Sequence, residues 1–532
     1  MMVEYAQHQK DAISFQQAVP FSINAMSTGT GKTVTSIGSQ LVNLHQHKLD
    51  KCIFVGTKGS LPEILNDYNK FYNFIPSQLN SIDSIYDFFT SNKTVAVTRY
   101  EWLKHFNQDL MNSYTKDLRL GMWWDEAQKL KNGSKDEHQS SGTQAHKYAK
   151  FLRNYCSSFH AVTATPIMTS LDDLWGIMHI VDNTVFGDYK TFCNTFYEQV
   201  LVPHPKERYR KTRCPVCRCE LIYKDGWDYC TNPACRAIQS PYGYLPYKVK
   251  VRSVWDLVEY KNIETLATLL QSHMFSFFPP QDINYIVHKF DLSDDAFSKY
   301  VAIAKNLDNE DDFVPFTTRR IELQYVVDRS LEKRQELWRL ANKIKHKGFV
   351  LYLSLYNTPG TNTMSSTTLQ EVKEVLDNVE GLEYRAYSGQ EKEFEREENK
   401  KWFQNDPVNK CLIITEAGGA SLNLQVTNEF VFYSMPDGFG KISQALGRIV
   451  RLFSTYKTFN IHVLMADKTI DLYKYIVFMM YSELIMKIMN NNLFGLKEPI
   501  KYNSIMKTLL RQKYCWKNGI KVDMYGNVTV SE

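Results

Sequence analysis

The segment AMSTGTGKTVTS, residues 25–36, holds glycine, lysine and threonine at spacings that suit the binding of a nucleotide's phosphates. Glycines let the main chain approach closely, and amides at the start of a helix favour phosphate oxygens. Lys32 would reach the β- and γ-phosphates, and the Thr33 hydroxyl would hold Mg²⁺. Met26 replaces the first glycine of the usual eight-residue pattern, and a helix is expected to begin at Thr33. The predicted phosphate- and magnesium-binding residues are Thr28, Gly29, Thr30, Gly31, Lys32 and Thr33.

An acidic pair follows an apolar run in MWWDEAQKLKN. Asp125 can bind Mg²⁺ through water, and Glu126 can orient or deprotonate an attacking water molecule. The alternative is an acidic pair with no chemical role at the surface end of a strand. Its position after the phosphate-binding segment favours the catalytic interpretation.

These residues must be held by strands, and the sequence indicates two blocks of them. In each block, short apolar runs alternate with helical patterns, which is typical of parallel α/β sheets. The region between the blocks, from Val181 to Lys345, lacks this alternation. We therefore expect an α/β fold of two parallel-sheet lobes with a helical, cysteine-bearing insertion between them. The predicted strands are 51–57, 94–98, 121–126, 160–166, 348–354, 410–416, 429–434 and 460–466.

Length and composition indicate a folded chain with several domains. The 532 residues exceed what one core usually holds, and 43% of them are hydrophobic. The formal net charge is only +5, but residues 201–254 carry 11 Lys/Arg against 4 Asp/Glu, and residues 496–532 carry 7 against 3. Such local basic surplus favours contact with nucleic acid.

The sequence shows no secretory signal at its N-terminus, so we expect no export. The apolar stretch 475–489 is interrupted by Glu483 and Lys487, and is too short and too charged for a membrane span. A helix with a buried face is the better interpretation. We expect an intracellular, reducing environment and no membrane, in which cysteines are thiols or metal ligands.

Four cysteines, in the pattern C-x2-C-x12-C-x4-C, predict a zinc site. Two close pairs separated by a short hairpin suit tetrahedral coordination by four thiolates. The site would be structural, because all four positions are filled. Cys219 is either a competing ligand or a bystander. The predicted zinc ligands are Cys214, Cys217, Cys230 and Cys235.

Two roles for this zinc-binding insert stay open. It can merely hold a long loop together. It can also contact DNA, because basic residues there are interleaved with aromatic ones, a mixture that suits phosphate contact and base stacking. The aromatic residues concerned are Tyr209, Tyr223, Trp227, Tyr229, Tyr242 and Tyr244.

Two longer stretches resemble motifs of the Swi/Snf branch of the superfamily 2 ATPases. DEAQKLKNGSK, which contains the acidic pair, resembles the DEAH-type box and the residues that follow it in that branch. VTATPIMTSLDDLWGIMHIVD, residues 162–182, is similar to its third motif. The resemblance covers about 5–182 and 348–481. It implies two RecA-like lobes with ATP and Mg²⁺ between them.

QALGRIVRLF, starting at Gln444, resembles motif six of the same family. Arg448 and Arg451 are three apart, and helical spacing would point both to one face. One of them can then reach the γ-phosphate from the second lobe, as an arginine finger. A solvated helix arginine would account for Arg448 alone but not for the set. The predicted catalytic residues are Lys32, Asp125, Glu126, Gln444, Arg448 and Arg451.

Other site residues follow only from the resemblance. YAQHQKDAI resembles the adenine-reading segment and puts Gln9 on the base. FVGTKGSLPEI and VAVTRYEWLK resemble elements that touch one DNA strand, and ITEAGGASLNLQ resembles motif five. The implied nucleic-acid contacts are Lys58, Thr98, Arg99, Thr165, Thr415, Gly418 and Gly419.

The resemblance implies a DNA-stimulated ATPase, most simply a monomer, that moves along duplex DNA and remodels protein–DNA complexes or branched DNA. The alternatives are a strand-separating or annealing helicase in replication or recombination, an RNA motor, and a catalytically silent nucleic-acid-binding scaffold. The intact lysine, acidic pair and arginines argue against the scaffold. A bare motor with a zinc-binding insert resembles those of bacteriophages or large DNA viruses.

The expected domains follow from these assignments. The ATP-binding first lobe takes residues 1–182, and the second lobe takes 346–495. The insertion and helical linker take 183–345, with a zinc ribbon at about 205–245. A basic C-terminal tail takes 496–532.

Overall fold

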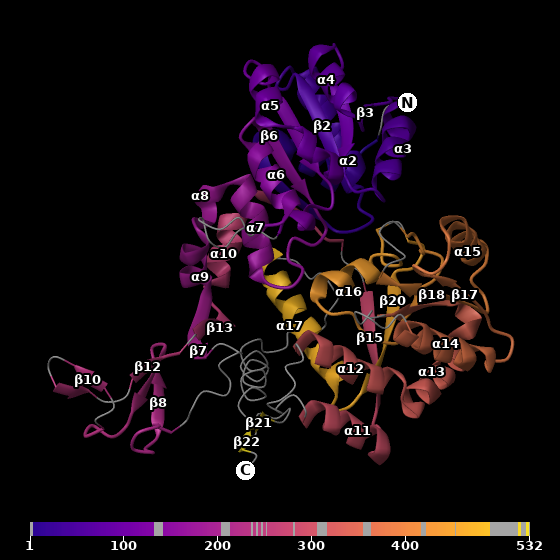
Figure 1. Cartoon of the computed structure of the whole chain (residues 1–532). Helices are drawn as coiled ribbons and strands as arrows, with labels where there is room; N and C mark the ends of the chain where they lie inside the picture. The colour runs from indigo at the N-terminus through magenta and orange to yellow at the C-terminus, as the bar shows by residue number, and fades with distance from the viewer. Residues whose placement is uncertain are drawn as a thin grey trace. The chain divides into compact units, whose positions relative to one another are not determined.

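The computed structural model divides the chain into two compact units. The larger comprises Met1–Phe192, Glu264–Leu307 and Val314–Ile500, and the smaller comprises Cys193–Ile263, Asp308–Phe313 and Lys501–Glu532. Figure 1 labels their helices and strands. The structure describes residues 4–131, 142–203, 213–235, 238–240, 243–245, 248–251, 253–279, 282–305, 316–354, 363–416, 422–452, 454–489, 520–522 and 528–530.

The N-terminal lobe of the larger unit is built on a seven-stranded sheet with the order β14-β1-β6-β5-β2-β4-β3. Every neighbouring pair in it is parallel. Its central strands are buried along nearly their whole length, as expected of a parallel sheet covered by helices on both faces. The strands are β1 (Phe21–Met26), β2 (Lys51–Gly56), β3 (Ser77–Leu79), β4 (Val95–Arg99), β5 (Leu120–Trp124), β6 (Cys156–Val162) and β14 (Met274–Phe277).

Helices pack on this sheet around a core that includes Phe54, Tyr68 and Trp123, all fully buried. Side-chain caps define some of their starts: the Ser81 hydroxyl accepts a hydrogen bond from the Ser84 amide at the start of α4. The helices are α1 (Gln7–Ala18), α2 (Lys32–His45), α3 (Leu61–Tyr72), α4 (Ile82–Thr90), the 3-10 helix η1 (Tyr100–His105), α5 (Gln108–Tyr114), the 3-10 helix η2 (Ala127–Leu130), α6 (Gln144–Arg153), α7 (Leu171–Val181) and α8 (Asn183–Phe186).

The C-terminal lobe has a six-stranded parallel sheet with the order β15-β20-β19-β16-β18-β17. Its strands are β15 (Asp282–Phe290), β16 (Phe349–Leu353), β17 (Glu383–Tyr387), β18 (Lys410–Thr415), β19 (Glu429–Phe432) and β20 (Thr458–Ala466). Its helices are α11 (Asp294–Lys305), α12 (Phe316–Asp328), α13 (Leu331–Ile344), the 3-10 helix η5 (Lys345–Lys347), α14 (Thr363–Asp377), α15 (Glu393–Asn405), α16 (Phe439–Leu446) and α17 (Ile470–Met489).

The expected α/β fold of two parallel-sheet lobes is confirmed. Two strands of the lobe sheets, however, lie between residues 183 and 345, the range expected for the insertion. β14 completes the edge of the first sheet, and β15 forms the edge of the second. The structural lobes therefore extend past the expected boundaries at 182 and 346. β15, with the sequence DINYIVHKF, places polar residues at both ends of a short apolar run, so it lacks the longer apolar run that was used to recognise strands.

The smaller unit is antiparallel where strands are described. β7 (Tyr197–Pro203) pairs with β13 (Ser253–Tyr260), and β8 (Leu221–Lys224), β9 (Trp227–Cys230) and β12 (Lys248–Lys250) form a three-stranded sheet. α9 (Tyr189–Phe196) precedes β7 along the chain, and α10 (Ile263–Gln271) follows β13. Two short hairpins remain, β10 (Ile238–Ser240) with β11 (Gly243–Leu245) and β21 (Ile520–Val522) with β22 (Val528–Val530).

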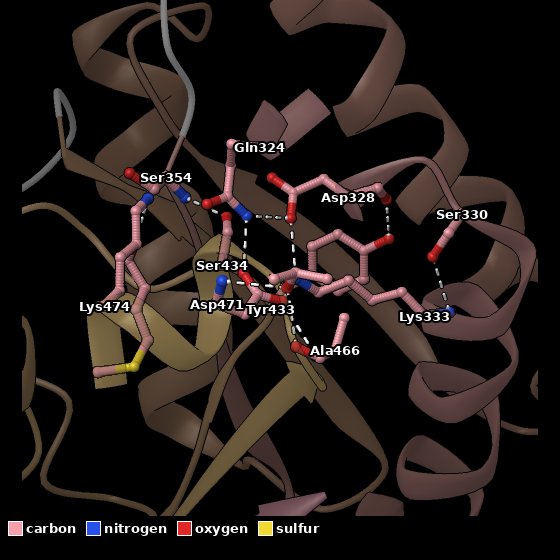
Figure 2. A network of polar contacts seen from close by, with 12 residues as sticks. Gln324, Asp328, Ser330, Lys333, Ser354, Tyr433, Ser434, Ala466, Asp471 and Lys474 are labelled. Atoms are coloured by element: carbon pink, nitrogen blue, oxygen red, sulfur yellow. Dashed lines mark hydrogen bonds and ion pairs between the residues drawn. The ribbon is translucent and has the colours of Figure 1, made fainter. Parts of the chain in front are cut away.

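A buried ionic network ties three helices of the C-terminal lobe together (Figure 2). The Lys333 ammonium of α13 lies 2.9 Å from the Asp328 carboxylate of α12 and 2.7 Å from the Asp471 carboxylate of α17. The Gln324 amide donates to both carboxylates, at 2.8 and 2.9 Å. Lys333 is fully buried, and burial raises the pKa of Asp328. The core of the lobe thus contains a buried cation and buried carboxylates, and each charge is stabilised by the opposite charge beside it.

No helix in the described part of the chain is both long enough and apolar enough to cross a lipid bilayer.

Candidate functional site

The segment predicted to bind phosphate, called the phosphate loop below, forms the turn between β1 and α2. Gly29 has φ +75° and Gly31 has φ +84°, a left-handed conformation that side chains disfavour. Gly31 caps α2, which begins at Lys32, one residue earlier than expected. The main-chain amides at the start of α2 therefore follow a turn whose conformation favours glycine. Amides at a helix start of this kind commonly bind phosphate oxygens.

Lys32 is folded back onto the loop. Its ammonium donates to the Ser27 carbonyl at 2.9 Å, and the Thr30 hydroxyl donates to the same carbonyl at 2.7 Å. Burial lowers the pKa of Lys32 to about 8, although the nearby Glu126 and Asp125 carboxylates favour its charged form. The ammonium is thus held at the loop by a neutral acceptor and close to the acidic pair.

α1 lies against the same loop. Gln9 donates to the Thr30 carbonyl at 3.2 Å, and a ring nitrogen of His8 lies 3.1 Å from that oxygen. A Cβ added at Gly31 would fall 2.3 Å from the Gln9 amide nitrogen. The expected adenine-reading residue, Gln9, therefore borders the phosphate loop. His8 also stacks on Phe277 at the end of β14, with ring centroids 4.1 Å apart.

The acidic pair follows β5 at the carboxyl edge of the first sheet. The Asp125 amide donates to the Val55 carbonyl at 2.8 Å, which fixes the turn next to β2. Burial raises the pKa of Asp125 to about 7, and the Glu126 charge adds to the effect. A hydrogen bond with Ser60 and the charge of Lys32 oppose the shift.

Glu126 adopts the left-handed conformation, with φ +52°. This position is uncommon for a residue with a side chain and often marks a functional turn. Its carboxylate accepts a hydrogen bond from the Gln128 amide. The Gln128 carbonyl oxygen in turn accepts from the Thr163 hydroxyl at 2.7 Å. Two consecutive hydrogen bonds between side chains thus link Glu126 of the acidic pair to Thr163, which follows β6.

Sequence reasoning missed Ser27, Ser60 and Gln128 as members of this site. Gln128 carried a readable signal, since it is the polar fourth residue of the acidic box. Ser60 is the N-cap residue of α3, and it lies in FVGTKGSLPEI, the stretch for which the resemblance implies contact with DNA. Ser27 acts through its main-chain carbonyl, so its residue type gave no signal.

Arg451 of the C-terminal lobe lies on the phosphate loop. A Cβ added at Gly29 would fall 2.8 Å from Arg451 Cγ. The guanidinium itself donates to the Gly447 and Leu422 carbonyls of its own lobe, both at 3.0 Å. The aliphatic part of the side chain therefore packs on the loop, and its charged end stays bonded within the second lobe.

Arg448 is buried within its own lobe, at 7% exposure. Among the described residues, its Nε and Nη1 atoms have no hydrogen-bond partner. Burial lowers its pKa, whereas Tyr352 and Tyr387 favour the charged form. A buried guanidinium without partners is costly, and an anion is the group that would satisfy it.

The expectation that both arginines lie on one helix face is wrong. α16 ends at Leu446, and residues 447–449 form a turn, so Arg448 and Arg451 follow the helix. Gly447, the first residue after the helix, packs on the first lobe: a Cβ there would fall 2.2 Å from the Thr28 hydroxyl oxygen. Gln444 lies on α16 and is half-buried.

The two lobes also meet beside the loop. The Gly440 amide donates to the Met168 carbonyl at 3.1 Å. A cavity of about 50 Å³ lies there, lined from the first lobe by Ser27, Thr28 and Ala164 and from the second by residues that include Ser443 and Gly447. That volume is small, so the second lobe contacts the loop almost directly in this structure.

The residues expected at nucleic acid fall into three groups. Lys58 is exposed after β2, and Arg99 is partly exposed at the end of β4. Three threonines are buried: Thr98 donates to the Leu79 carbonyl, Thr165 donates to Met168 Sδ, and Thr415 ends β18. These three side chains are buried, contrary to a role at the surface. Gly418 and Gly419 lie outside the described residues.

The four predicted zinc ligands come together. Their sulfur atoms all lie within 4.8 Å of one another, with 3.5 Å between Cys214 and Cys235 and 3.4 Å between Cys217 and Cys230. Zinc at about 2.3 Å from four sulfurs requires sulfur separations of about 3.8 Å, so this donor set fits the ion. Cys219 is not one of the four.

The hairpin that spaces the two cysteine pairs has the turn that its sequence predicts. Asp225 and Gly226 have φ +50° and +84° between β8 and β9. Positive φ at both central residues is the type I′ geometry for which Asp-Gly is favoured. The turn thereby sets Cys230 beside the first pair.

Residues 337–453 match the family described as the helicase conserved C-terminal domain. No curated protein matches the chain. Among solved structures, the ATP-dependent Type ISP restriction-modification enzyme LlaBIII bound to DNA is 12% identical, with a TM-score of 0.51 over 92% of this chain and 30% of that chain. At that identity the likeness concerns the fold alone.

Two structures from Sulfolobus solfataricus are also similar. The SWI2/SNF2 ATPase core in complex with dsDNA is 16% identical, covers 95% of each chain and has a TM-score of 0.37. The SWI2/SNF2 ATPase core domain is 16% identical, covers 89% of this chain and 87% of that chain, and has a TM-score of 0.36. Residues 337–453 thus match the helicase conserved C-terminal domain, in a chain whose two parallel-sheet lobes meet at the glycine loop.

Proposed function

We propose that the protein is an ATP-dependent DNA motor of the Swi/Snf type, which hydrolyses ATP to move along duplex DNA. The contact of Arg451 with Gly29 is the observation that carries the proposal, because it brings the second lobe onto the phosphate loop of the first. A motor of this kind needs a γ-phosphate bound between a lysine and acids on one lobe and guanidinium groups on the other.

The first lobe would bind the nucleotide. The glycine loop and the α2 amides suit the phosphates, and Lys32 would leave the Ser27 carbonyl to reach the β- and γ-phosphates. Asp125 and Thr33 would hold Mg²⁺, which neutralises phosphate charge when bound. Glu126 would orient or deprotonate the attacking water, and its hydrogen bond with Gln128 would position it.

The second lobe would complete the site. Arg448 supplies buried N–H groups that lack a partner among the described residues, and an anion would satisfy them. Arg451 already lies at the loop and would exchange its bonds to Gly447 and Leu422 for bonds to phosphate. Gln444, on the helix before both arginines, would line the same edge.

Movement along DNA would follow from changes in the relative positions of the two lobes during the ATP hydrolysis cycle. A ligand can shift a conformational equilibrium only through different affinities for its states. If the affinity of each lobe for the DNA phosphate backbone differs before and after ATP hydrolysis, this difference in affinity would produce directed steps. Contacts with the backbone carry no sequence information, so such movement suits any sequence.

DNA is the proposed track because two of the similar structures are described as bound to DNA or dsDNA. Lys58 and Arg99, at the surface near the carboxyl ends of β2 and β4, are the side chains placed to contact phosphates in the first lobe. The cysteine cluster would hold one structural zinc ion. The remaining expectations, a monomer of intracellular location, stay predictions.

The proposal is tested by ATP turnover measured with single-stranded DNA, duplex DNA, forked DNA and RNA at one stated salt concentration. We expect duplex DNA to stimulate turnover most and Lys32→Ala to abolish it. Turnover that no nucleic acid changes, or that survives Lys32→Ala, would contradict the proposal. A triplex-displacement assay detects duplex translocation, and strand displacement on forks detects a strand-separating helicase instead.

A further inference from the structure

The three-stranded sheet beside the cysteine cluster has two unlike faces. Register sets Lys224, Trp227 and Lys250 in one row across β8, β9 and β12. Ile222 and Tyr229 form the next row, in which Lys248 is the β12 position. Because side chains two residues apart in a strand share a face, both rows lie on the same side of the sheet. We call Ile222, Lys224, Trp227, Tyr229 and Lys250 the lysine–aromatic face.

The opposite face is committed to the cysteine cluster. Leu221 and Cys230 belong to the buried group of cysteines and pack with Cys214 and Cys235. Asp228, the acidic residue within these strands, alternates onto that side and is only 2% exposed. The lysine–aromatic face therefore points away from the cluster and carries no acidic residue at its described strand positions.

The lysine–aromatic face is open to solvent in part. Ile222 is 53% exposed, Lys224 and Lys250 are exposed, and the rings of Trp227 and Tyr229 are partly exposed. The Lys250 ammonium lies 6.0 Å from the centre of the Trp227 ring. Aromatic rings with ammonium groups near them are complementary to a ligand that has both flat faces and negative charge.

We propose that this face binds single-stranded nucleic acid, with bases stacked on Trp227 and Tyr229 and phosphates paired with Lys224 and Lys250. Unpaired bases are favoured over a duplex, because a duplex hides its base faces from a flat aromatic surface. The surplus of seven positive charges over residues 201–254 adds attraction for any polyanion. A protein partner with an acidic, apolar surface is the competing occupant, and the test below separates the two.

The inference is independent of ATP hydrolysis, so its test uses the zinc-loaded full chain carrying Lys32→Ala. A short oligothymidylate, its RNA counterpart and a duplex of the same length are titrated by fluorescence anisotropy over a series of salt concentrations. Oligothymidylate that bears 5-iodouracil is then photocrosslinked, and the crosslinked peptides are identified by mass spectrometry. Crosslinks to Trp227 or Tyr229 are expected.

Three variants isolate the face. Trp227→Ala should weaken single-strand binding about tenfold, as loss of one stacking platform does. Lys224→Gln with Lys250→Gln should reduce the slope of log affinity against log salt by about one to two. Val249→Ala is the matched control: it lies between two lysine positions of β12 but on the other face, is 41% exposed, and should change neither quantity.

The zinc content of each variant, measured alongside, reports whether the sheet still folds. The lysine variants change only exposed side chains, so they keep the test valid if Trp227→Ala loses zinc. The proposal is overturned if crosslinks fall only on the motor lobes, if the duplex binds this face better than the single strand, or if the lysine variants match Val249→Ala. Equal binding of DNA and RNA strands would support it, since stacking does not distinguish them.

Discussion

The side chain of Arg451 covers Gly29, so a residue of the segment that matches the helicase C-terminal domain lies over the turn that we expect to bind phosphate. A Cβ at Gly29 would fall 2.8 Å from Arg451 Cγ, inside the distance that packed carbon atoms allow. The absence of a side chain at position 29 is therefore needed for two reasons. The turn has φ +75°, and the opposite lobe occupies the space that a Cβ would need.

The variant Gly29→Ala tests this closure. We expect ATP turnover to fall on the order of 100-fold, because small misplacements at a catalytic centre are costly. Gly381→Ala is the matched control, since Gly381 has φ +70° but no atom within 4 Å of its added Cβ. Both variants should lose about 1–2 kcal/mol of stability from the left-handed conformation, and only the first should lose activity. Equal turnover in the two variants would show that the contact is incidental.

Arg448→Met should separate stability from activity. Because two N–H groups of this buried guanidinium have no partner among the described residues, removing it should leave the free energy of unfolding unchanged or raise it. ATP turnover should fall about 10³- to 10⁵-fold, the range lost when an arginine finger is removed. Urea denaturation and steady-state turnover measure the two effects. A large loss of stability would mean that Arg448 is a structural residue.

Lys333→Met is the opposite case of a buried cation. Lys333 neutralises two buried carboxylates, so its loss leaves Asp328 and Asp471 uncompensated. We expect about 3–5 kcal/mol of destabilisation, seen as a lower urea midpoint. The triple replacement of Lys333, Asp328 and Asp471 by apolar residues should recover most of that loss. Failure to recover would assign the cost to packing and not to charge.

The dependence of turnover on magnesium should change with pH. Burial raises the pKa of Asp125 to about 7, so its carboxylate gains a proton as pH falls through 7, where an ordinary aspartate stays ionised. The half-saturating Mg²⁺ concentration should rise about tenfold per pH unit below 7 and level off above it. Asp125→Asn should lose this dependence together with most activity. A flat profile in the unmodified protein would show that Asp125 does not bind the ion.

An alkaline limit should accompany the acidic one. The pKa of Lys32 is lowered to about 8, so its ammonium loses a proton as pH rises through 8. Nucleotide affinity should then weaken above pH 8, because the charge that pairs with phosphate is lost. Equilibrium binding of a fluorescent nucleotide across this range measures the effect, and Lys32→Arg should move the limit to higher pH.

Zinc content should distinguish the ligand cysteines from their neighbour. Cys230→Ser should reduce bound zinc from about one ion per chain to none, because a serine hydroxyl is a poor replacement for a thiolate. Cys219→Ser should retain the ion, since Cys219 is not one of the four clustered residues. Loss of zinc in both variants would place Cys219 in the coordination sphere.

The sequence predicted most of the central strands, because buried parallel strands are mostly runs of apolar residues. LGMWW in β5 and FVLYL in β16 are examples, and both were found where expected. The glycine loop was also readable, since two positive φ angles and a helix start demand Gly29 and Gly31. These features are local: a few neighbouring residues determine them.

Features that depend on distant residues were not readable. β14 and β15 become strands because each adds to the edge of a sheet formed far away in sequence. α16 ends at Leu446, so Arg448 and Arg451 lie beyond the helix, where Gly447 packs against Thr28 of the other lobe. The burial of Thr98 and Thr165 likewise follows from packing, which their motif positions did not reveal.

The placement of β14 and β15 has a mechanical consequence. Phe277 ends a strand of the first sheet and Asp282 begins a strand of the second, five residues later in the chain. A fully extended chain of that length spans only about 18 Å. This short connection therefore limits how far apart the adjoining ends of the two sheets can move, so the movement that we propose would pivot about the connection. Glycines inserted into this connection would weaken the proposed coupling between ATP hydrolysis and movement along DNA, although every residue near the predicted phosphate site would be unchanged.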